Sequence, residues 1–146
     1  MSKVSPVARD GVERIPTGLA LVPGTVTTLR GELGRVLNHY NRASGGALLA
    51  AAADLLGSTS VNTVGAGFPD GFLDVQSNPD ARLMATGGIC EDAMSGILCG
   101  LSGYGRHIGV GSSYGAFLAA LGHIAARLHA IGPRPDGRPT GIPSTR

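Results

Sequence analysis

Apolar and polar positions along the middle of the chain follow patterns typical of helices and strands in turn. After Thr27 and Thr28, either of which can cap a helix, apolar residues recur at helical spacing over about 29–40. The apolar run 47–53 then predicts a buried strand, although its four consecutive alanines also favour a helix. The chain therefore begins its ordered part with a helix followed by a core segment.

Two later segments, 82–86 and 106–110, are also predicted to be strands, and each precedes a helical pattern, over 91–101 and about 114–130. The segment 57–80 is rich in Gly, Ser, Asn, Asp and Pro and predicts a long loop with at most a short helix. Strands that alternate with helices predict an α/β fold with a parallel sheet.

The two ends of the chain differ in composition from the middle. Residues 1–26 carry three prolines without a sustained period, which indicates a linker or flexible arm. Residues 132–146 are rich in Pro, Gly and Arg, lack the apolar residues of a core and are expected to be a disordered tail. We therefore assign one domain to 27–131.

Composition narrows the classes of partner. Of the 146 residues, 42% are hydrophobic and 15% charged, against about 25% charged in an average domain; a chain with so few charges is expected to bury part of its surface against a partner. The formal net charge of +2 is too small to indicate a basic surface that binds nucleic acid. The N-terminus lacks an apolar signal region, and the most apolar segment, 46–57, is too short to span a bilayer. We expect a cytoplasmic protein that binds neither nucleic acid nor membranes.

Polar residues follow all three predicted strands. Asp54 and Ser58 come after the first, 87–91 after the second and 111–114 after the third. Because ligands collect at the carboxyl ends of parallel strands, these segments are expected to meet in one site.

These three segments, in this order and spacing, resemble the pyrimidine-binding (Pyr) domain of transketolases and related thiamine diphosphate-dependent enzymes. The matching pieces are Ala53-Asp54-Leu55 with Ser58, Gly88–Met94 and Gly111–Phe117, and Arg30 lies at a fitting distance ahead of Asp54. The resemblance covers about 28–131. It implies a three-layer α/β fold of the Pyr-domain type, a parallel sheet with flanking helices, incomplete at its C-terminal end because the pattern changes abruptly at 132.

The resemblance implies a catalytic role for Glu91. In the family, a glutamate at this position shares a proton with a nitrogen of the cofactor's aminopyrimidine ring, which activates the cofactor. Taken alone, Glu91 would also be explained by the attraction between an acid and the first turn of a helix. Its neighbours, Cys90 and Asp92, differ from the Arg-Glu-His triplet of many transketolases, which leaves the substrate preference open.

Three more residues are implied to bind the cofactor. Tyr114 and Phe117, three apart on the expected helix, match the aromatic wall that stacks on the pyrimidine, although core packing would explain them as well. Ala120 stands where transketolases have a third aromatic residue. Asp54 lies where the family places an aspartate near the cofactor and the substrate channel; a carboxylate that caps a loop is the alternative.

Arg30 and Ser58 match positions that hold the phosphate of a sugar-phosphate substrate. An arginine offers a planar fork of donors to phosphate and a serine offers a hydroxyl. An arginine in the first turn of an exposed helix is also commonly only solvated, which is the alternative for Arg30.

The chain lacks the Gly-Asp-Gly segment and the asparagine with which the family's diphosphate-binding (PP) domain holds Mg²⁺. No metal ligands are therefore expected here, and the partner is expected to be a PP-domain protein or the missing part of the same enzyme, in a dimeric assembly. The chain would be a fragment or subunit of an enzyme that transfers a two-carbon ketol unit between sugar phosphates, inactive alone.

Several alternatives remain at this stage. The chain could belong to another thiamine diphosphate enzyme, of the 2-oxo acid dehydrogenase E1 or deoxyxylulose-phosphate synthase type. It could instead be a non-catalytic interaction domain, or the remnant of a gene.

Overall fold

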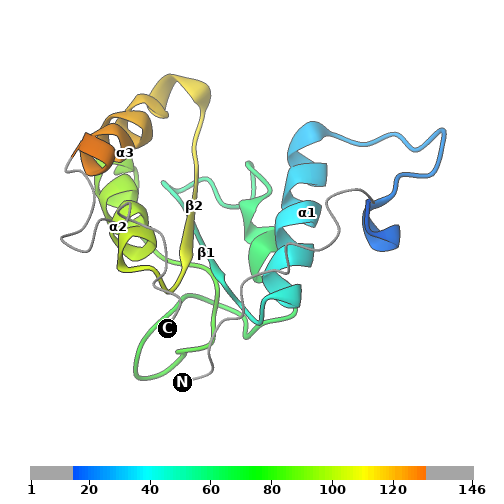
Figure 1. The fold of residues 1–146 in the computed structure, drawn as a ribbon, viewed down its shortest axis with the longest axis horizontal. Coiled ribbons are helices and arrows are strands. Elements are labelled where there is room, and N and C mark those ends of the chain that lie inside the picture. Colours follow the sequence, from blue (N-terminus) through cyan, green and yellow to red (C-terminus); the bar gives the residue numbers. More distant parts are fainter. Residues whose placement is uncertain (1–14, 131–146) are drawn as a thin grey trace.

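The computed structural model describes residues 15–130 as a small α/β fold (Figure 1). Its helices and strands are α1 (Leu29–Ala43), β1 (Leu48–Ala52), α2 (Glu91–Tyr104), β2 (Ile108–Ser112) and α3 (Ala119–Ala130). Three short 3₁₀ helices accompany them: η1 (Thr17–Leu19), η2 (Val61–Gly65) and η3 (Gly115–Phe117).

β1 and β2 pair in parallel along their whole length, from Leu48 opposite Ile108 to Ala52 opposite Ser112. The predicted α/β class is therefore confirmed, and the run 47–53 is a strand rather than a helix. Its leucines and alanines are buried on both faces, and an apolar run of this kind is typical of a strand that is covered on each side.

The expected strand 82–86 forms less regular structure than predicted. It pairs with β1 at a single parallel bridge, between Leu83 and Ala50. The Met84 amide donates to the Ala50 carbonyl (2.8 Å), and the Ala50 amide donates to the Arg82 carbonyl (3.0 Å). The ladder does not continue, because Thr86 is followed by two glycines with positive φ, Gly87 and Gly88. β1 nevertheless has an extended neighbour on each side.

Apolar side chains cover both faces of β1. On one face, Ala50 packs with Val61 and Val64 of η2. On the other, Ala51 packs with Met94 and Leu98 of α2. Figure 1 shows α1 on one side of the strands and α2 with α3 on the other, and α2 contacts both β1 and β2. The helices thus leave the carboxyl ends of the strands open for a site.

A buried asparagine joins α1 to the core. Asn41 is fully buried, and its Nδ2 donates to the Val64 carbonyl (2.9 Å) while its Oδ1 accepts from the Leu48 amide (2.7 Å). One side chain therefore fixes the end of α1 to both η2 and the first residue of β1.

The first helix begins as expected, because the Gly31 amide donates to the Thr28 hydroxyl (3.2 Å) and Thr28 is the N-cap. The prediction of a helix from about 114 is wrong at its start: α3 begins at Ala119. Tyr114 is extended (φ −69°, ψ 146°) and Phe117 ends the 3₁₀ helix η3. Gly115, a poor helix former, separates the extended chain after β2 from the helix.

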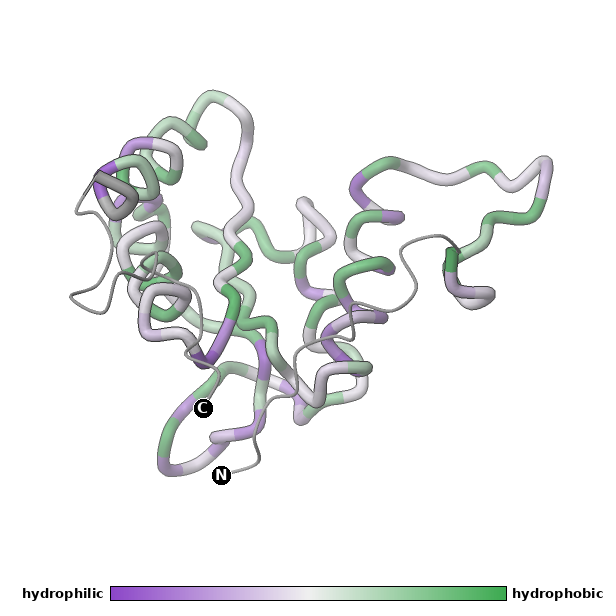
Figure 2. Tube along the Cα trace, in the orientation of Figure 1, coloured by the Kyte–Doolittle hydropathy of each residue, from purple (hydrophilic) through white to green (hydrophobic). Residues whose placement is uncertain are grey.

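Part of the expected N-terminal arm lies beside α1. Arg35 donates to the carbonyls of Gly18 (2.6 Å) and Leu19 (2.9 Å), and it pairs with Glu32 (2.6 Å). Figure 2 shows hydrophobic residues in the strands but also in the segment before α1, where Val26 is 98% exposed. Residues 1–14 of the arm, and the tail predicted over 132–146, lie outside the described residues.

Between residues 15 and 130, no helix is both long and apolar enough to cross a membrane.

Candidate functional site

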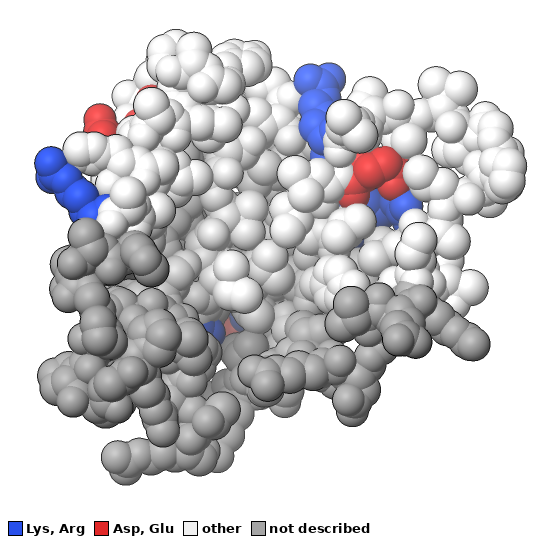
Figure 3. Space-filling model, turned by 45° about the horizontal axis from the view of Figure 1, so that its top comes forward, with Lys and Arg blue, Asp and Glu red and all other residues white. Residues whose placement is uncertain are grey.

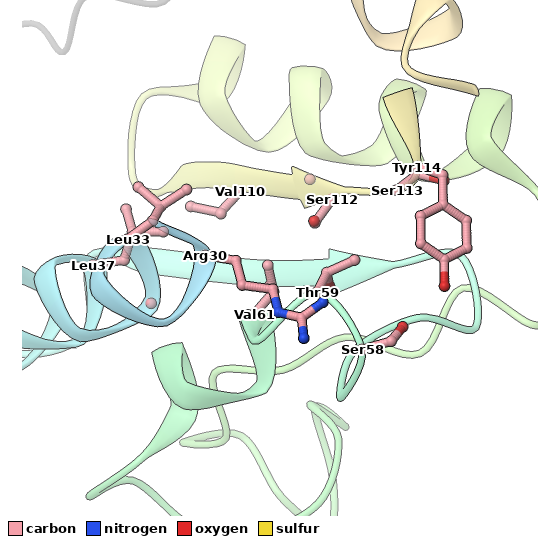
Figure 4. A pocket seen from close by; sticks show the side chains of 12 residues that line it. Arg30, Leu33, Leu37, Ser58, Thr59, Val61, Val110, Ser112, Ser113 and Tyr114 are labelled. Carbon is pink, nitrogen blue, oxygen red and sulfur yellow. The ribbon is translucent and has the colours of Figure 1, made fainter. Parts of the chain in front are cut away.

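A pocket of about 270 Å³ lies between α1, the segment after β1 and the end of β2 (Figure 4). Six residues with polar side chains line it: Arg30, Ser58, Thr59, Ser112, Ser113 and Tyr114. Its aliphatic lining comes from Leu33, Leu37, Val61 and Val110. Three residues expected to contact substrate or cofactor, Arg30, Ser58 and Tyr114, are thus brought together from three separate parts of the chain.

Glu91 is connected to this pocket through a serine. It is the first residue of α2, and its Oε1 accepts a hydrogen bond from the Ser113 hydroxyl (2.9 Å). Ser113 is buried and directly follows β2. The bond joins the start of α2 to the end of β2, so the carboxylate is held at the carboxyl edge of the sheet.

Arg30 is well placed to bind an anion. It lies in the first turn of α1, and Glu32–Arg35 is the sole ion pair found between described side chains, so no carboxylate neutralises Arg30 there. Ser58 donates its hydroxyl proton to the Leu55 carbonyl (3.2 Å), so this hydroxyl would have to turn away from Leu55 to donate to an anion. A guanidinium beside hydroxyl groups is a combination that binds phosphate or carboxylate groups.

Asp54 lines a different pocket. This second pocket, of about 440 Å³, also includes Thr86, Gly87 and Gly88, which lead toward α2. Asp54 is separated from the end of β1 by the buried Ala53, and it has a left-handed backbone (φ 59°), which is uncommon for a residue other than glycine. The hydroxyl oxygen of Thr86 is buried without a hydrogen-bond partner. The acid and this hydroxyl supply polar groups to the second pocket.

Phe117 lines neither of these two pockets, and half of it is exposed (52%). Tyr114 is similarly exposed, at 55%, and its ring lies at the pocket with Ser58 (Figure 4). The expectation that both lie on one α-helix face is wrong because the helix begins after them. Tyr114 therefore belongs to the pocket, whereas Phe117 lies outside it.

The sequence pattern did not single out Thr59, Ser112 or Ser113 as site residues, nor the aliphatic lining. Ser113 lies within the quoted segment Gly111–Phe117, but its contact is with a carboxylate 22 positions away. A short sequence pattern cannot predict a contact between residues that are so far apart along the chain.

Charged groups are few around the site. Figure 3 shows a face of the molecule on which a few Arg, Asp and Glu side chains lie among broad uncharged areas. Between residues 15 and 130, no three His, Cys, Asp or Glu side chains are grouped so that they could hold a metal ion. The site's chemistry, as far as these residues show it, rests on one arginine, several hydroxyls and two separate carboxylates.

No protein-family model, curated protein or solved structure matches this chain.

Proposed function

We propose that this chain is the pyrimidine-binding half of a transketolase-like, thiamine diphosphate-dependent enzyme of the cytoplasm, with a three-layer fold of the Pyr-domain type. Its reaction is the transfer of a two-carbon ketol unit between sugar phosphates. One observation carries the proposal: the Ser113 hydroxyl binds the Glu91 carboxylate beside the pocket that Arg30, Ser58 and Tyr114 line. The sequence resemblance assigns cofactor activation to that glutamate and substrate binding to that arginine and serine.

The side chains at this edge fit the aminopyrimidine part of the cofactor. Ser113 occupies Oε1 of Glu91, and no described residue donates a hydrogen bond to Oε2, so one carboxyl oxygen is available to exchange a proton with a ring nitrogen. Tyr114 presents an exposed aromatic ring on which a flat heterocycle can stack. Asp54 and, from outside the pocket, Phe117 complete the set that we assign to the cofactor.

When bound, thiamine diphosphate supplies the nucleophilic carbon that accepts the ketol unit. The residues of this chain orient the reactants and move the proton. Glu91 holds or releases the proton at the ring nitrogen, while Arg30 and Ser58 bind the substrate phosphate away from the reacting carbon. A substrate fixed at both ends loses less freedom at the reaction step.

The proposed partner is a PP-domain protein, or the remaining part of the same enzyme, in a dimeric assembly. It would hold the diphosphate group and Mg²⁺, for which hard oxygen ligands are needed. The exposed aromatic rings of Tyr114 and Phe117 support this proposal, because such surface is usually covered in an assembly.

The proposal is tested by reconstituting the chain with a PP-domain protein, thiamine diphosphate and Mg²⁺ and measuring ketol transfer. Glu91→Gln is expected to lower turnover by about 100-fold or more, as for loss of a general acid–base group. It should leave assembly, followed by size-exclusion chromatography, unchanged. Asp92→Asn is the matched control: it removes the neighbouring exposed acid of the same helix turn and should retain turnover.

A chain that assembles with the PP-domain protein but shows no turnover would contradict the enzymatic proposal and favour an interaction domain. Equal turnover of Glu91→Gln and the unchanged chain would remove Glu91 from catalysis. Turnover with 2-oxo acids in place of sugar phosphates would assign the chain to the decarboxylating relatives instead.

A further inference from the structure

The pocket that contains Arg30 has two chemically different ends. Figure 4 shows Leu33, Leu37 and Val110 at one end, Ser58 and Tyr114 at the other, and Arg30 with Val61 between them. We propose that this pocket binds a small ligand whose anionic group pairs with Arg30 and whose short aliphatic chain fills the Leu–Val end.

The aliphatic end offers no side-chain partner for a hydroxylated carbon chain. Leu33 and Leu37 come from one face of α1, and Val110 comes from the middle of β2. Leu33 is 57% exposed, so apolar surface remains for a ligand to cover. A sugar carbon at this end would give up hydrogen bonds to water without replacement, whereas a methylene group would gain from burial.

The anionic group of the ligand is assigned to Arg30, whose guanidinium lies between the two ends of the pocket (Figure 4). Since no described carboxylate pairs with it, a phosphate or carboxylate group would supply the missing counter-charge. Arg30 and Leu33 are three residues apart on α1 and therefore lie on one face of that helix. One helix thus presents a cation and an apolar side chain to the same pocket.

The pocket's volume limits the ligand's size. About 270 Å³ lies just below the usual range for small-molecule sites, ~300–1,000 Å³. A phosphate or carboxylate group on a chain of a few carbons suits that space. This inference goes beyond the proposed function, because it needs neither cofactor nor partner. If both hold, the aliphatic ligand competes with a sugar phosphate for Arg30.

A matched ligand series tests the inference on the full chain without thiamine diphosphate. Methyl phosphate, n-propyl phosphate and sn-glycerol 3-phosphate are titrated at constant ionic strength while NMR follows the methyl signals of leucine and valine. Propyl phosphate carries two more methylene groups than methyl phosphate, and each buried methylene tightens binding about threefold to fourfold. We expect propyl phosphate to bind about tenfold more tightly, with shifts at Leu33, Leu37, Val61 and Val110.

The glycerol ester has the same chain length as the propyl ester but adds two hydroxyls. It is expected to bind no more tightly than methyl phosphate. Binding of glycerol 3-phosphate as tight as, or tighter than, that of propyl phosphate would overturn the inference, as would the absence of saturable propyl phosphate binding.

Variants locate the two ends of the ligand. Arg30→Gln should weaken binding of all three phosphates about tenfold, because the loss of a hydrogen bond to a charged group usually has an effect of about that size. Arg127→Gln, which removes an exposed arginine of α3, should leave binding unchanged. Equal weakening by both variants would show attraction by net charge and would overturn the assignment to Arg30.

Val110→Thr keeps nearly the same volume but places a hydroxyl at the aliphatic end. It should reduce the preference for propyl over methyl phosphate to about threefold or less. An unchanged preference would place the alkyl chain elsewhere and overturn the inference. The ligand series on the unaltered chain keeps the inference testable if this variant folds poorly. Failure of the series leaves the Glu91→Gln experiment intact, so the two proposals fail separately.

Discussion

β1 and β2 have the same length and pair residue for residue, but they differ in how they are covered. All five residues of β1 are buried, whereas β2 begins with Ile108, which is 59% exposed, and remains partly exposed to its end. β1 has extended chain on both sides, and β2 has one strand neighbour within residues 15–130. The covered strand supports the core, and the less covered strand supplies residues to the pocket.

The sequences of the two strands explain this difference. β1 is a run of leucines and alanines, whose small and medium side chains let η2 and α2 approach from opposite faces. β2 contains two glycines, and at Gly109 α2 comes so close that an added Cβ would lie 2.6 Å from the Leu98 carbonyl oxygen. The close packing of α2 on β2 leaves the other face of β2 to the pocket.

Asn41→Ala is expected to have the largest effect on the free energy of unfolding, because Asn41 joins α1 to the buried strand β1. This change leaves the Leu48 amide without a partner in the core and leaves the Val64 carbonyl with only the longer bond from Asn38 Nδ2 (3.5 Å); an unpaired buried group costs about 1–3 kcal/mol. We expect a loss of about 2–5 kcal/mol in the free energy of unfolding, measured by urea denaturation with far-ultraviolet circular dichroism. Asn38→Ala, on the same helix, removes an exposed bond to the Ala66 carbonyl and a long bond to the Val64 carbonyl (3.5 Å), which keeps its bond from Asn41, and it should cost under about 1 kcal/mol. Equal losses would mean that Asn41 does not fix β1.

A pair of glycine variants tests the packing of α2 on β2. Gly109→Ala forces Cβ against the backbone of Leu98, and we expect a loss of about 1–3 kcal/mol in unfolding free energy. At Gly111 the nearest atom, 3.0 Å away, is the end of the Leu98 side chain, which can move. Gly111→Ala should therefore cost less than Gly109→Ala in the same denaturation experiment. The reverse order would contradict the close approach at Gly109.

The smallest expected effect concerns pH and His107, which precedes β2. Burial lowers the pKa of His107, and the nearby charges of Arg82 and Arg106 lower it further. The unfolded chain therefore takes up this proton first as the pH falls below the ordinary histidine pKa of about 6.5. The contribution of His107 to the free energy of unfolding should be constant above about pH 6.5 and should decrease between that pH and the lowered pKa. Denaturation at pH 7.5 and 5.5 should show a smaller decline for His107→Gln; an equal decline would place the pH dependence elsewhere.

Local pattern predicted most of the architecture. The alanine-rich run predicted β1, and the pair Thr27 and Thr28 predicted the start of α1. It failed where spacing alone does not decide: 82–86 pairs with β1 at only one bridge, and α3 starts five residues later than predicted. Asn41 could not be found, because a polar residue in a helix ordinarily faces water.

The site was only partly predictable for the same reason. Polar residues after each strand indicated one edge of the sheet, and Arg30, Ser58 and Tyr114 do share a pocket. The pattern did not separate Asp54 into a second pocket or place Phe117 outside both. Those outcomes depend on how the chain bends after each strand, which follows from φ and ψ at single residues.

The backbone at Asp54 has a consequence for how this position tolerates change. A left-handed conformation costs an ordinary L-residue about 1 kcal/mol or more, and glycine adopts it without that penalty. Selection for stability alone would thus accept glycine at position 54, and the carboxylate is the feature that such a replacement would lose. Stability therefore favours glycine at this position, two residues after β1, whereas the proposed role of the carboxylate requires aspartate.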